Sequence, residues 1–401
     1  MIDPQQFLYS FIDNQSIELV SIIGSGSYGV VYLGRYVYTN RYYAVKCLHD
    51  NHVTRNEVEM HSTLSGHANI LTLEKVIKER NHVFIIMEYA THGDLFSSIT
   101  QPELSQALIG KTKVIRHLFL QILDAVQHCH HNLIAHRDLK PENILLLSNH
   151  RVKLADFGLT TNQMISKEFN CGSSFYFSPE CQGVTVVSGD RNMKQVQYYD
   201  TLANDIWSLG IILVNLVSGR NPWKQANMQD TAFAAYVKQP RRFFRTILPG
   251  ISKSLDRILI RIFCLDPAKR ITLPELRNMI LACRLFTVAA PNTSSSSTNT
   301  DTPAVPQDVK PMTPPPSSTQ IQCSESFEST MLAYIGDYTD DEGFTTNSSH
   351  CELTSSSSDD SSAASDEDPS TPCNDISPVS NFHHHHHKIQ YEQQYIENYG
   401  Y

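Results

Sequence analysis

The stretch AHRDLKPENILLL, residues 135–147, places several charged side chains directly before an apolar run. At these spacings Asp138 can orient an alcohol or accept its proton, and Lys140 can neutralise charge on a phosphoryl group. Asn143 can coordinate a metal ion, and the later stretch LADFG supplies a second oxygen ligand, Asp156. Two such ligands facing a polyphosphate suit Mg²⁺. The pattern predicts phosphoryl transfer at a magnesium site, with Asp138, Lys140 and Asn143 as catalytic residues.

A glycine-rich stretch lies between two segments with strand-like alternation, residues 18–26 and 29–36. Glycines at such a place let backbone N–H groups approach phosphate oxygens closely. The element that follows is expected to be a strand rather than a helix, which argues against a dinucleotide-binding fold. The nucleotide contacts expected here are Ile23, Gly24, Ser25, Gly26, Ser27, Tyr28, Gly29, Val30 and Val31.

Lys46 lies near the end of another apolar, strand-like segment. Burying an unpaired ammonium is costly, so this lysine needs a carboxylate partner or must extend to solvent. We expect Lys46 to contact nucleotide phosphates and to pair with Glu57 in the next helical segment. Glu59 is the rival partner. Glu57 is favoured because Met60 and Leu64 follow it by three and seven residues and lie near its face.

The apolar segment 82–89 leads into a turn that could bind the base and sugar of the nucleotide. Backbone groups near its end could pair with an adenine edge, and Asp94 could accept a hydrogen bond from a ribose hydroxyl. Read alone, the segment is an ordinary strand that ends in a loop. The further nucleotide contacts expected are Ala44, Met87, Glu88, Ala90, Asp94 and Leu145.

The periodicity of apolar residues changes along the chain. Strands are expected at 18–26, 29–36, 41–48, 70–79 and 82–89, with one helix at 53–66. From about residue 94 to 285 the pattern is mostly helical, and the clearest helices are expected at 113–131, 205–219 and 253–265. A small antiparallel sheet with one helix, followed by a larger helical region, predicts an α+β fold.

Taken together, these motifs resemble those of eukaryotic protein kinases of the serine/threonine type over about residues 17–285. The resemblance implies a bilobal protein kinase fold over residues 17–288, with an N-lobe at about 17–90 and a C-lobe at about 91–288. It also implies ATP and Mg as cofactors, protein substrates, and Asn143 and Asp156 as metal ligands.

The same resemblance gives roles to residues outside the first motifs. Asp205 in DIWSLG resembles the aspartate that braces the catalytic-loop backbone, and Arg270 in LDPAKRIT resembles the arginine that pairs with Glu180. Lys140 resembles the lysine of the serine/threonine subclass. Several longer phrases, such as ANDIWSLGIILVNLVSGRNPW, are similar to fungal kinases that restrain meiosis or respond to nutrients.

In the family, an arginine in the place of Arg137 usually binds a phosphate on the activation segment. Here Phe169 stands where many relatives carry the phosphorylated threonine. We expect Glu168 to supply the anion instead, so that no activating phosphorylation is needed. The rival hypothesis is phosphorylation of Ser166 or Thr161. The resemblance further implies that Ser173 contacts Asp138 and Lys140.

Three features depart from the family pattern. The interval between Lys46 and Glu57 is short, so the helix is expected to start late. Ser178 replaces the usual alanine before Pro179. The connection from Glu180 to Asp205 is long, and we expect an exposed insertion at about 183–196, either a docking surface or a plain surface loop.

Charge and composition divide the chain near residue 289. Residues 289–401 contain 17 acidic and 2 basic residues, a net of −15, whereas residues 1–288 contain 24 acidic and 30 basic residues, a net of +6. The Ser/Thr/Pro-rich composition after residue 288 predicts a disordered acidic tail. Proline-directed kinases could modify it at Thr302, Thr313, Thr371 and Ser377. Residues 1–16 are expected to be an N-terminal extension.

The nine cysteines are scattered without a Cys-x-x-Cys pair, which favours a reduced compartment. No secretory signal or membrane-spanning stretch is expected, so we expect a cytoplasmic or nuclear protein without membrane or nucleic-acid partners. The alternative function is a pseudokinase-like scaffold whose tail recruits partners. Lys46, Asp138 and Asp156 are all present, which favours the enzyme.

Overall fold

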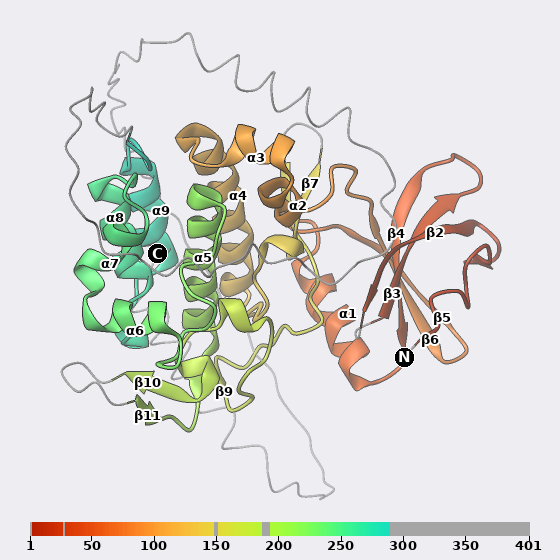
Figure 1. Ribbon diagram of the computed structural model, residues 1–401. Coiled ribbons are helices and arrows are strands. Elements are labelled where there is room, and N and C mark those ends of the chain that lie inside the picture. The colour runs from red at the N-terminus through yellow and green to blue at the C-terminus, as the bar shows by residue number, and fades with distance from the viewer. Residues whose placement is uncertain (1, 27–28, 148–150, 187–192, 289–401) are drawn as a thin grey trace, which may run out of the picture. The chain divides into compact units, whose positions relative to one another are not determined.

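The computed structural model describes residues 2–26, 29–147, 151–186 and 193–288 (Figure 1). Two residues predicted to contact the nucleotide, Ser27 and Tyr28, lie outside the described residues. The predicted tail, 289–401, lies outside them as well.

The N-lobe is built on a six-stranded antiparallel sheet with the strand order β1-β2-β3-β4-β6-β5. The strands are Phe11–Ile12 (β1), Ile17–Gly26 (β2), Gly29–Tyr36 (β3), Tyr42–His49 (β4), Leu73–Glu79 (β5) and His82–Glu88 (β6). Side chains alternate across the sheet, so Val30 and Tyr32 pack in one apolar cluster and Val31 in another. The five predicted strands are confirmed, although β5 begins at Leu73 rather than at residue 70.

The segment before residue 17, predicted as an extension, packs on this sheet. Its strand β1 pairs with the start of β2, and the side chains of Ile2 and Ile12 are buried in the sheet's core. The Tyr32 hydroxyl donates a hydrogen bond to the Pro4 carbonyl at 3.0 Å. A two-residue strand has too few positions to show alternation, so the sequence pattern could not predict it.

Helix α1, His52–Leu64, begins only three residues after β4 ends. Asn51 makes this tight start feasible because its side chain accepts a hydrogen bond from the Thr54 N–H at 2.9 Å and caps the helix. The buried face carries Thr54, Glu57, Met60, His61 and Leu64, whereas Glu59 is exposed.

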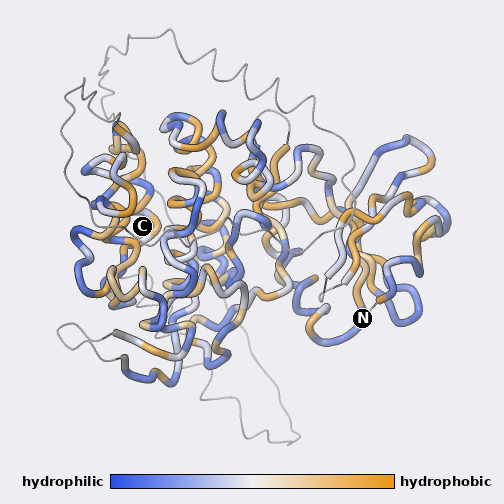
Figure 2. The backbone as a smooth tube through the Cα atoms, in the orientation of Figure 1, coloured by the Kyte–Doolittle hydropathy of each residue, from blue (hydrophilic) through white to orange (hydrophobic). Residues whose placement is uncertain are grey.

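The C-lobe is mainly helical (Figure 1). Its helices are Leu95–Thr100 (α2), Pro102–Leu108 (α3), Thr112–His131 (α4), Thr201–Ser218 (α5), Thr231–Lys238 (α6), Pro240–Ile247 (α7), Lys253–Ile262 (α8) and Leu273–Ala282 (α9). Figure 2 shows apolar residues concentrated along α5 and the helices around it. Of the described helices, α5 alone is long and apolar enough to cross a membrane, but 94% of it is buried in the protein, as expected of a core helix.

Short strands and 3-10 turns connect these helices. The strands are Ile144–Leu147 (β7), Arg151–Leu154 (β8), Ile165–Ser166 (β9), Val184–Val186 (β10), Met193–Gln195 (β11) and Tyr199–Asp200 (β12). The 3-10 turns are Pro141–Asn143 (η1), Ser174–Tyr176 (η3), Glu180–Gln182 (η4) and Pro267–Lys269 (η5). The predicted insertion at 183–196 contains the antiparallel pair β10 and β11, and residues 187–192 of it lie outside the described residues.

Helix α7 carries the basic and aromatic stretch PRRFFRTI. Phe243 and Phe244 are buried, while Arg241 and Arg242 are exposed. The aromatic rings are core residues and cannot stack on the bases of a nucleic acid.

Candidate active site

A buried lysine connects β4, α1 and the segment after β8. The Lys46 Nζ donates to Glu57 Oε1 at 2.6 Å and to Asp156 Oδ1 at 2.8 Å. Burial lowers the pKa of Lys46, but the two carboxylates more than offset this, so the pKa is raised. Burial also raises the pKa of Asp156, and the ammonium more than offsets it, so that pKa lies below its usual value. The pairing of Lys46 with Glu57 rather than the exposed Glu59 is confirmed.

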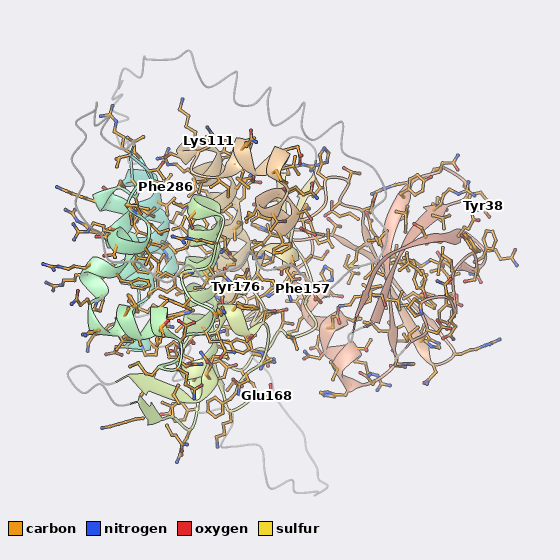
Figure 3. The ribbon with its side chains drawn as sticks, viewed as in Figure 1. Tyr38, Lys111, Phe157, Glu168, Tyr176 and Phe286 are labelled. Carbon is orange, nitrogen blue, oxygen red and sulfur yellow. The ribbon has the colours of Figure 1, made fainter. Side chains whose placement is uncertain are left out.

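Phe157, the residue after Asp156, is labelled in Figure 3; its side chain is fully buried and contacts two histidine rings. The ring of His61 in α1 lies 4.5 Å from the Phe157 ring, and the ring of His136 lies 5.5 Å from it, centroid to centroid. The His61 Nε2 bonds the Leu71 carbonyl at 2.7 Å, which fixes the ring. These contacts hold the segment after β8 so that Asp156 faces Lys46.

The Asp205 carboxylate in α5 stabilises the backbone of the catalytic loop. Its carboxylate accepts the backbone N–H groups of His136 at 2.8 Å and Arg137 at 2.9 Å. A third contact, 2.9 Å, joins it to His130 Nε2. Arg137 has a φ of +64°, a left-handed backbone conformation that residues other than glycine rarely adopt, so these bonds stabilise the loop in it.

The loop places two polar side chains, those of Lys140 and Asn143, against Asp138. The Lys140 Nζ donates to Asp138 Oδ2 at 2.7 Å, and the Asn143 Nδ2 donates to the Asp138 carbonyl at 2.9 Å. Asp138 Oδ1 is buried and has no hydrogen-bond partner among the described residues. A buried carboxylate oxygen without a partner is costly, so this atom is suited to accept a proton or hydrogen bond from a bound group. Ser173 is connected to Asp138 through Lys140, whose Nζ lies 3.0 Å from the Ser173 Oγ.

The two predicted metal ligands lie beside each other at the open end of the β7–β8 hairpin. The Ala155 N–H donates to the Asn143 carbonyl at 2.9 Å, so Asp156 directly follows a residue bonded to Asn143. Because the Asn143 amide nitrogen bonds Asp138, the amide oxygen faces the other way. An amide oxygen and a carboxylate are the hard ligands Mg²⁺ prefers, so this pair fits the ion. In the described part of the chain, no cluster of three or more His, Cys, Asp or Glu side chains could form a separate metal site.

Several predicted nucleotide contacts form one apolar cluster. Val31, Ala44, Met87 and Leu145 belong to it, together with Ala155 next to the metal ligands. Ala44 is paired with Met87 across β4 and β6, and Gly24 with Val31 across β2 and β3. The remaining described residues of the glycine-rich stretch, Ile23, Ser25, Gly26 and Gly29, lie in β2 and β3, where Gly26 is paired with Gly29.

Val30 corrects the prediction for this stretch. Its side chain is 1% exposed and packs with Leu19 and Tyr32 in the opposite face of the sheet. Neighbouring residues of a strand point to opposite faces, so Val30 and Val31 cannot both cover the nucleotide with their side chains.

Two carboxylates predicted to contact the nucleotide have structural partners. Glu88 Oε1 accepts from the Thr72 N–H at 2.7 Å and pairs with Lys153 Nζ at 2.7 Å. The Glu88 side chain is therefore paired within the protein, and the Glu88 N–H donates to the Thr72 carbonyl at 3.0 Å. The predicted contact of Glu88 with the base is thus left to its backbone carbonyl, beside the backbone of Ala90. Asp94 Oδ1 caps α2 by accepting the Ser97 N–H at 2.6 Å.

The end of the activation segment is tied to the C-lobe. Arg270 Nη1 lies 2.5 Å from Glu180 Oε1, and both side chains are nearly fully buried. Ser178 stands in place of the family's alanine, and its Oγ donates a hydrogen bond to Asn204 Oδ1 at 2.9 Å. The hydroxyl therefore has a buried partner in α5 and does not disturb the packing.

Sequence reasoning missed the side chains that support the site from outside it. Thr72, Lys153, His61 and Asn204 belong to this group. Lys153 carried the same signal as Lys46, a lysine in an apolar strand, and could have been found by asking which carboxylate pairs with it.

The protein kinase domain family model matches residues 17–281, so the chain belongs to the protein kinase family. It is similar to the "Negative regulator of sexual conjugation and meiosis" of Schizosaccharomyces pombe, with 39% identity over 72% of this chain and 64% of that protein. It is also 33% identical to "Serine/threonine-protein kinase ksp1" of the same yeast, over 66% of this chain and 56% of that protein. "Serine/threonine-protein kinase VHS1" of Saccharomyces cerevisiae is 34% identical over 59% of this chain and 51% of its own length. The chain thus matches only about half to two thirds of each of these relatives.

Proposed function

We propose that the chain transfers the γ-phosphate of ATP to serine or threonine hydroxyls of protein substrates, in a reaction that depends on Mg²⁺. The observation that carries this proposal is the hydrogen bonding of Lys46 to Glu57 and Asp156, together with a buried Asp138 carboxylate oxygen that has no hydrogen-bond partner in the described part of the chain. The serine/threonine class is supported by the names of the two yeast serine/threonine-protein kinases that the chain resembles.

The residues divide the work by their chemistry. Lys46 holds the phosphates of the nucleotide, and Asn143 and Asp156 hold Mg²⁺, which when bound spreads the negative charge of the phosphates. Asp138 orients the substrate hydroxyl and takes up its proton. Lys140, held between Asp138 and Ser173, neutralises charge on the transferred group.

The nucleotide base lies, in this proposal, against the cluster formed by Val31, Ala44, Met87 and Leu145. Their packing together supports it. The backbone carbonyl of Glu88 and the backbone of Ala90 pair with the adenine edge, and Asp94 bonds the ribose through the carboxylate oxygen that does not cap α2.

A transfer assay with γ-labelled ATP and a generic basic protein tests the function. The wild-type chain should label serine and threonine in the acceptor only when Mg²⁺ is present, and the Asp138→Asn variant should not. Equal labelling by the two proteins would overturn the catalytic assignment. Binding of ATP without any transfer by the wild type would favour a scaffold instead.

The cellular role we propose is intracellular signalling, in the cytoplasm, the nucleus or both. The support is the similarity to a yeast protein that is named as a negative regulator of sexual conjugation and meiosis. Phosphoproteomic comparison of cells with and without the gene, grown in rich medium and under nutrient starvation, tests this role. An unchanged phosphoproteome in both conditions would contradict it.

A further inference from the structure

Arg137 connects the catalytic loop to two points of the activation segment. Its Nε donates to the Leu159 carbonyl at 2.7 Å, close after Asp156, and its Nη1 lies 2.7 Å from Glu168 Oε2. The Arg137 side chain is 8% exposed, so its charge needs a nearby anion. Burial lowers the pKa of Arg137, but pairing with Glu168 more than offsets this and the pKa is raised.

The backbone around Glu168 is fixed by contacts that do not involve its carboxylate. Its N–H donates to the Ser166 Oγ at 3.0 Å, and its carbonyl accepts from the Tyr199 hydroxyl at 3.3 Å. Ser166 is itself paired with Tyr199 across β9 and β12. The Glu168 side chain is 72% exposed, and Figure 3 shows it at the outer edge of the segment.

The hydroxyl groups considered as phosphorylation sites already have other partners. Residues 156–180 are all described, and Glu168 is the side chain among them that pairs with Arg137. Ser166 is 1% exposed and its Oγ is bonded to Glu168. The Thr161 Oγ1 accepts from the Gln163 N–H at 3.1 Å.

The position of this segment bears directly on the catalytic loop. Gly172 has a φ of +106°, and a Cβ added there would lie 2.3 Å from the Arg137 carbonyl oxygen and 3.2 Å from Asp138 Oδ1. The next residue, Ser173, contacts Lys140. A segment released from Arg137 would therefore loosen the groups that surround Asp138.

We propose that the Glu168 carboxylate is a positioning group that takes the place of an activating phosphate, so that the chain is active without phosphorylation of its activation segment. In kinases controlled by phosphorylation, a phosphate paired with arginine orders this segment. A carboxylate carries less charge than a phosphate but makes the same kind of charge-assisted hydrogen bond. The inference rests on the proposed kinase function.

The test uses the full-length chain treated with phosphatase, with mass spectrometry showing that residues 156–180 carry no phosphate before and after the assay. The treated wild type should keep its transfer rate to within about twofold. Glu168→Gln should lower kcat about five- to tenfold while the KM for ATP changes little, because Lys46 is untouched. Glu168→Asp, which keeps the negative charge, should lower kcat less than Glu168→Gln does.

Two controls separate the loss of the Arg137–Glu168 pair from a general disturbance of the activation segment. Lys167→Gln removes the neighbouring exposed charge and should leave kcat unchanged. High salt should slow the wild type more than Glu168→Gln, because an exposed pair is screened.

The outcomes distinguish this inference from the proposed function. A wild type that transfers phosphate only before phosphatase treatment overturns the inference and leaves the kinase function standing. A Glu168→Gln variant with wild-type kcat also overturns it. Absence of transfer by treated and untreated wild type alike contradicts the kinase function itself.

Discussion

Lys46 keeps a positive charge inside the protein because two carboxylates neutralise it. Glu57 is 4% exposed, and its one hydrogen-bonded side-chain partner among the described residues is this ammonium. Burial keeps the pKa of Glu57 raised even beside Lys46. Removing Lys46 therefore leaves the buried Glu57 without its ammonium, which costs more than the pair itself contributes, whereas removing Glu57 leaves Lys46 paired with Asp156 alone.

We expect Lys46→Met and Glu57→Gln to lower phosphate transfer by about 100-fold or more, because the contact that orients the phosphates is lost. Lys46→Met should also lower the free energy of unfolding by about 3 kcal/mol, since Glu57 stays buried. The matched control is Glu59→Gln, which changes an exposed charge on the same helix. Transfer assays and thermal unfolding of the three variants check this, and a Glu59→Gln defect as large as that of Glu57→Gln would contradict it.

At the scale of elements, α1 and the segment after β8 are joined by the stacking of His61 on Phe157. Burial lowers the pKa of His61 to about 4, and the charged groups near the ring are Lys46 and Asp156. A histidine with a lowered pKa stays neutral in the folded state. As the pH falls below about 6.5, the unfolded chain gains a proton that the folded chain does not, so stability is lost until the pH reaches about 4.

From this shift we expect His61 to reduce the free energy of unfolding by about 2 kcal/mol between pH 7 and pH 5. The variant His61→Leu keeps an apolar contact with Phe157 but has no titrating group. Its loss of stability over the same interval should be smaller than that of the wild type by about this amount. Urea unfolding at both pH values measures it, and parallel losses in the two proteins would refute the assignment.

How far the sequence predicted each element depended on the range of the contacts involved. Alternation and helical spacing are local, and they predicted β2 to β6, α1, α4, α5 and α8. The link of Glu88 to Lys153 joins residues far apart in the chain. The apolar strand around Lys153 indicates that this lysine needs a carboxylate, but no local pattern identifies Glu88 as the partner, so Glu88 was predicted only as a nucleotide contact.

Across the whole molecule, the predicted site residues come from both lobes and meet only when the chain is folded. Lys46 and Asp156 are 110 residues apart in sequence and 2.8 Å apart in space. Motifs of fixed spacing predicted that these two residues belong to one site, and the structure shows the contact between them. The supporting side chains around the site were less predictable. No sequence pattern indicated the contact of His61 with Phe157 or the hydrogen bond between Ser178 and Asn204.

The buried ion pair of Arg270 with Glu180 attaches the end of the activation segment to the C-lobe, and removing it measures how much this attachment contributes to stability. Arg270 also donates to the Ala203 carbonyl at 2.8 Å, and its guanidinium lies 5.0 Å from the centre of the Trp207 ring. We expect Arg270→Met to lower the free energy of unfolding by about 3–5 kcal/mol, because Glu180 is left buried without a partner. Lys269→Met, at an adjacent exposed position, should change it by less than about 0.5 kcal/mol. Similar midpoints of thermal unfolding for the two variants would show that the buried pair contributes little.

The most direct test of the account measures ATP binding and phosphate transfer on the same preparations of wild type and Asp138→Asn. Because Asp138 acts on the incoming hydroxyl and not on the nucleotide, the variant should bind ATP with Mg²⁺ about as tightly as the wild type. Its single-turnover transfer rate should fall by about 1,000-fold or more. Equal transfer rates at equal ATP occupancy would contradict the claim that this carboxylate and its surroundings form the catalytic centre.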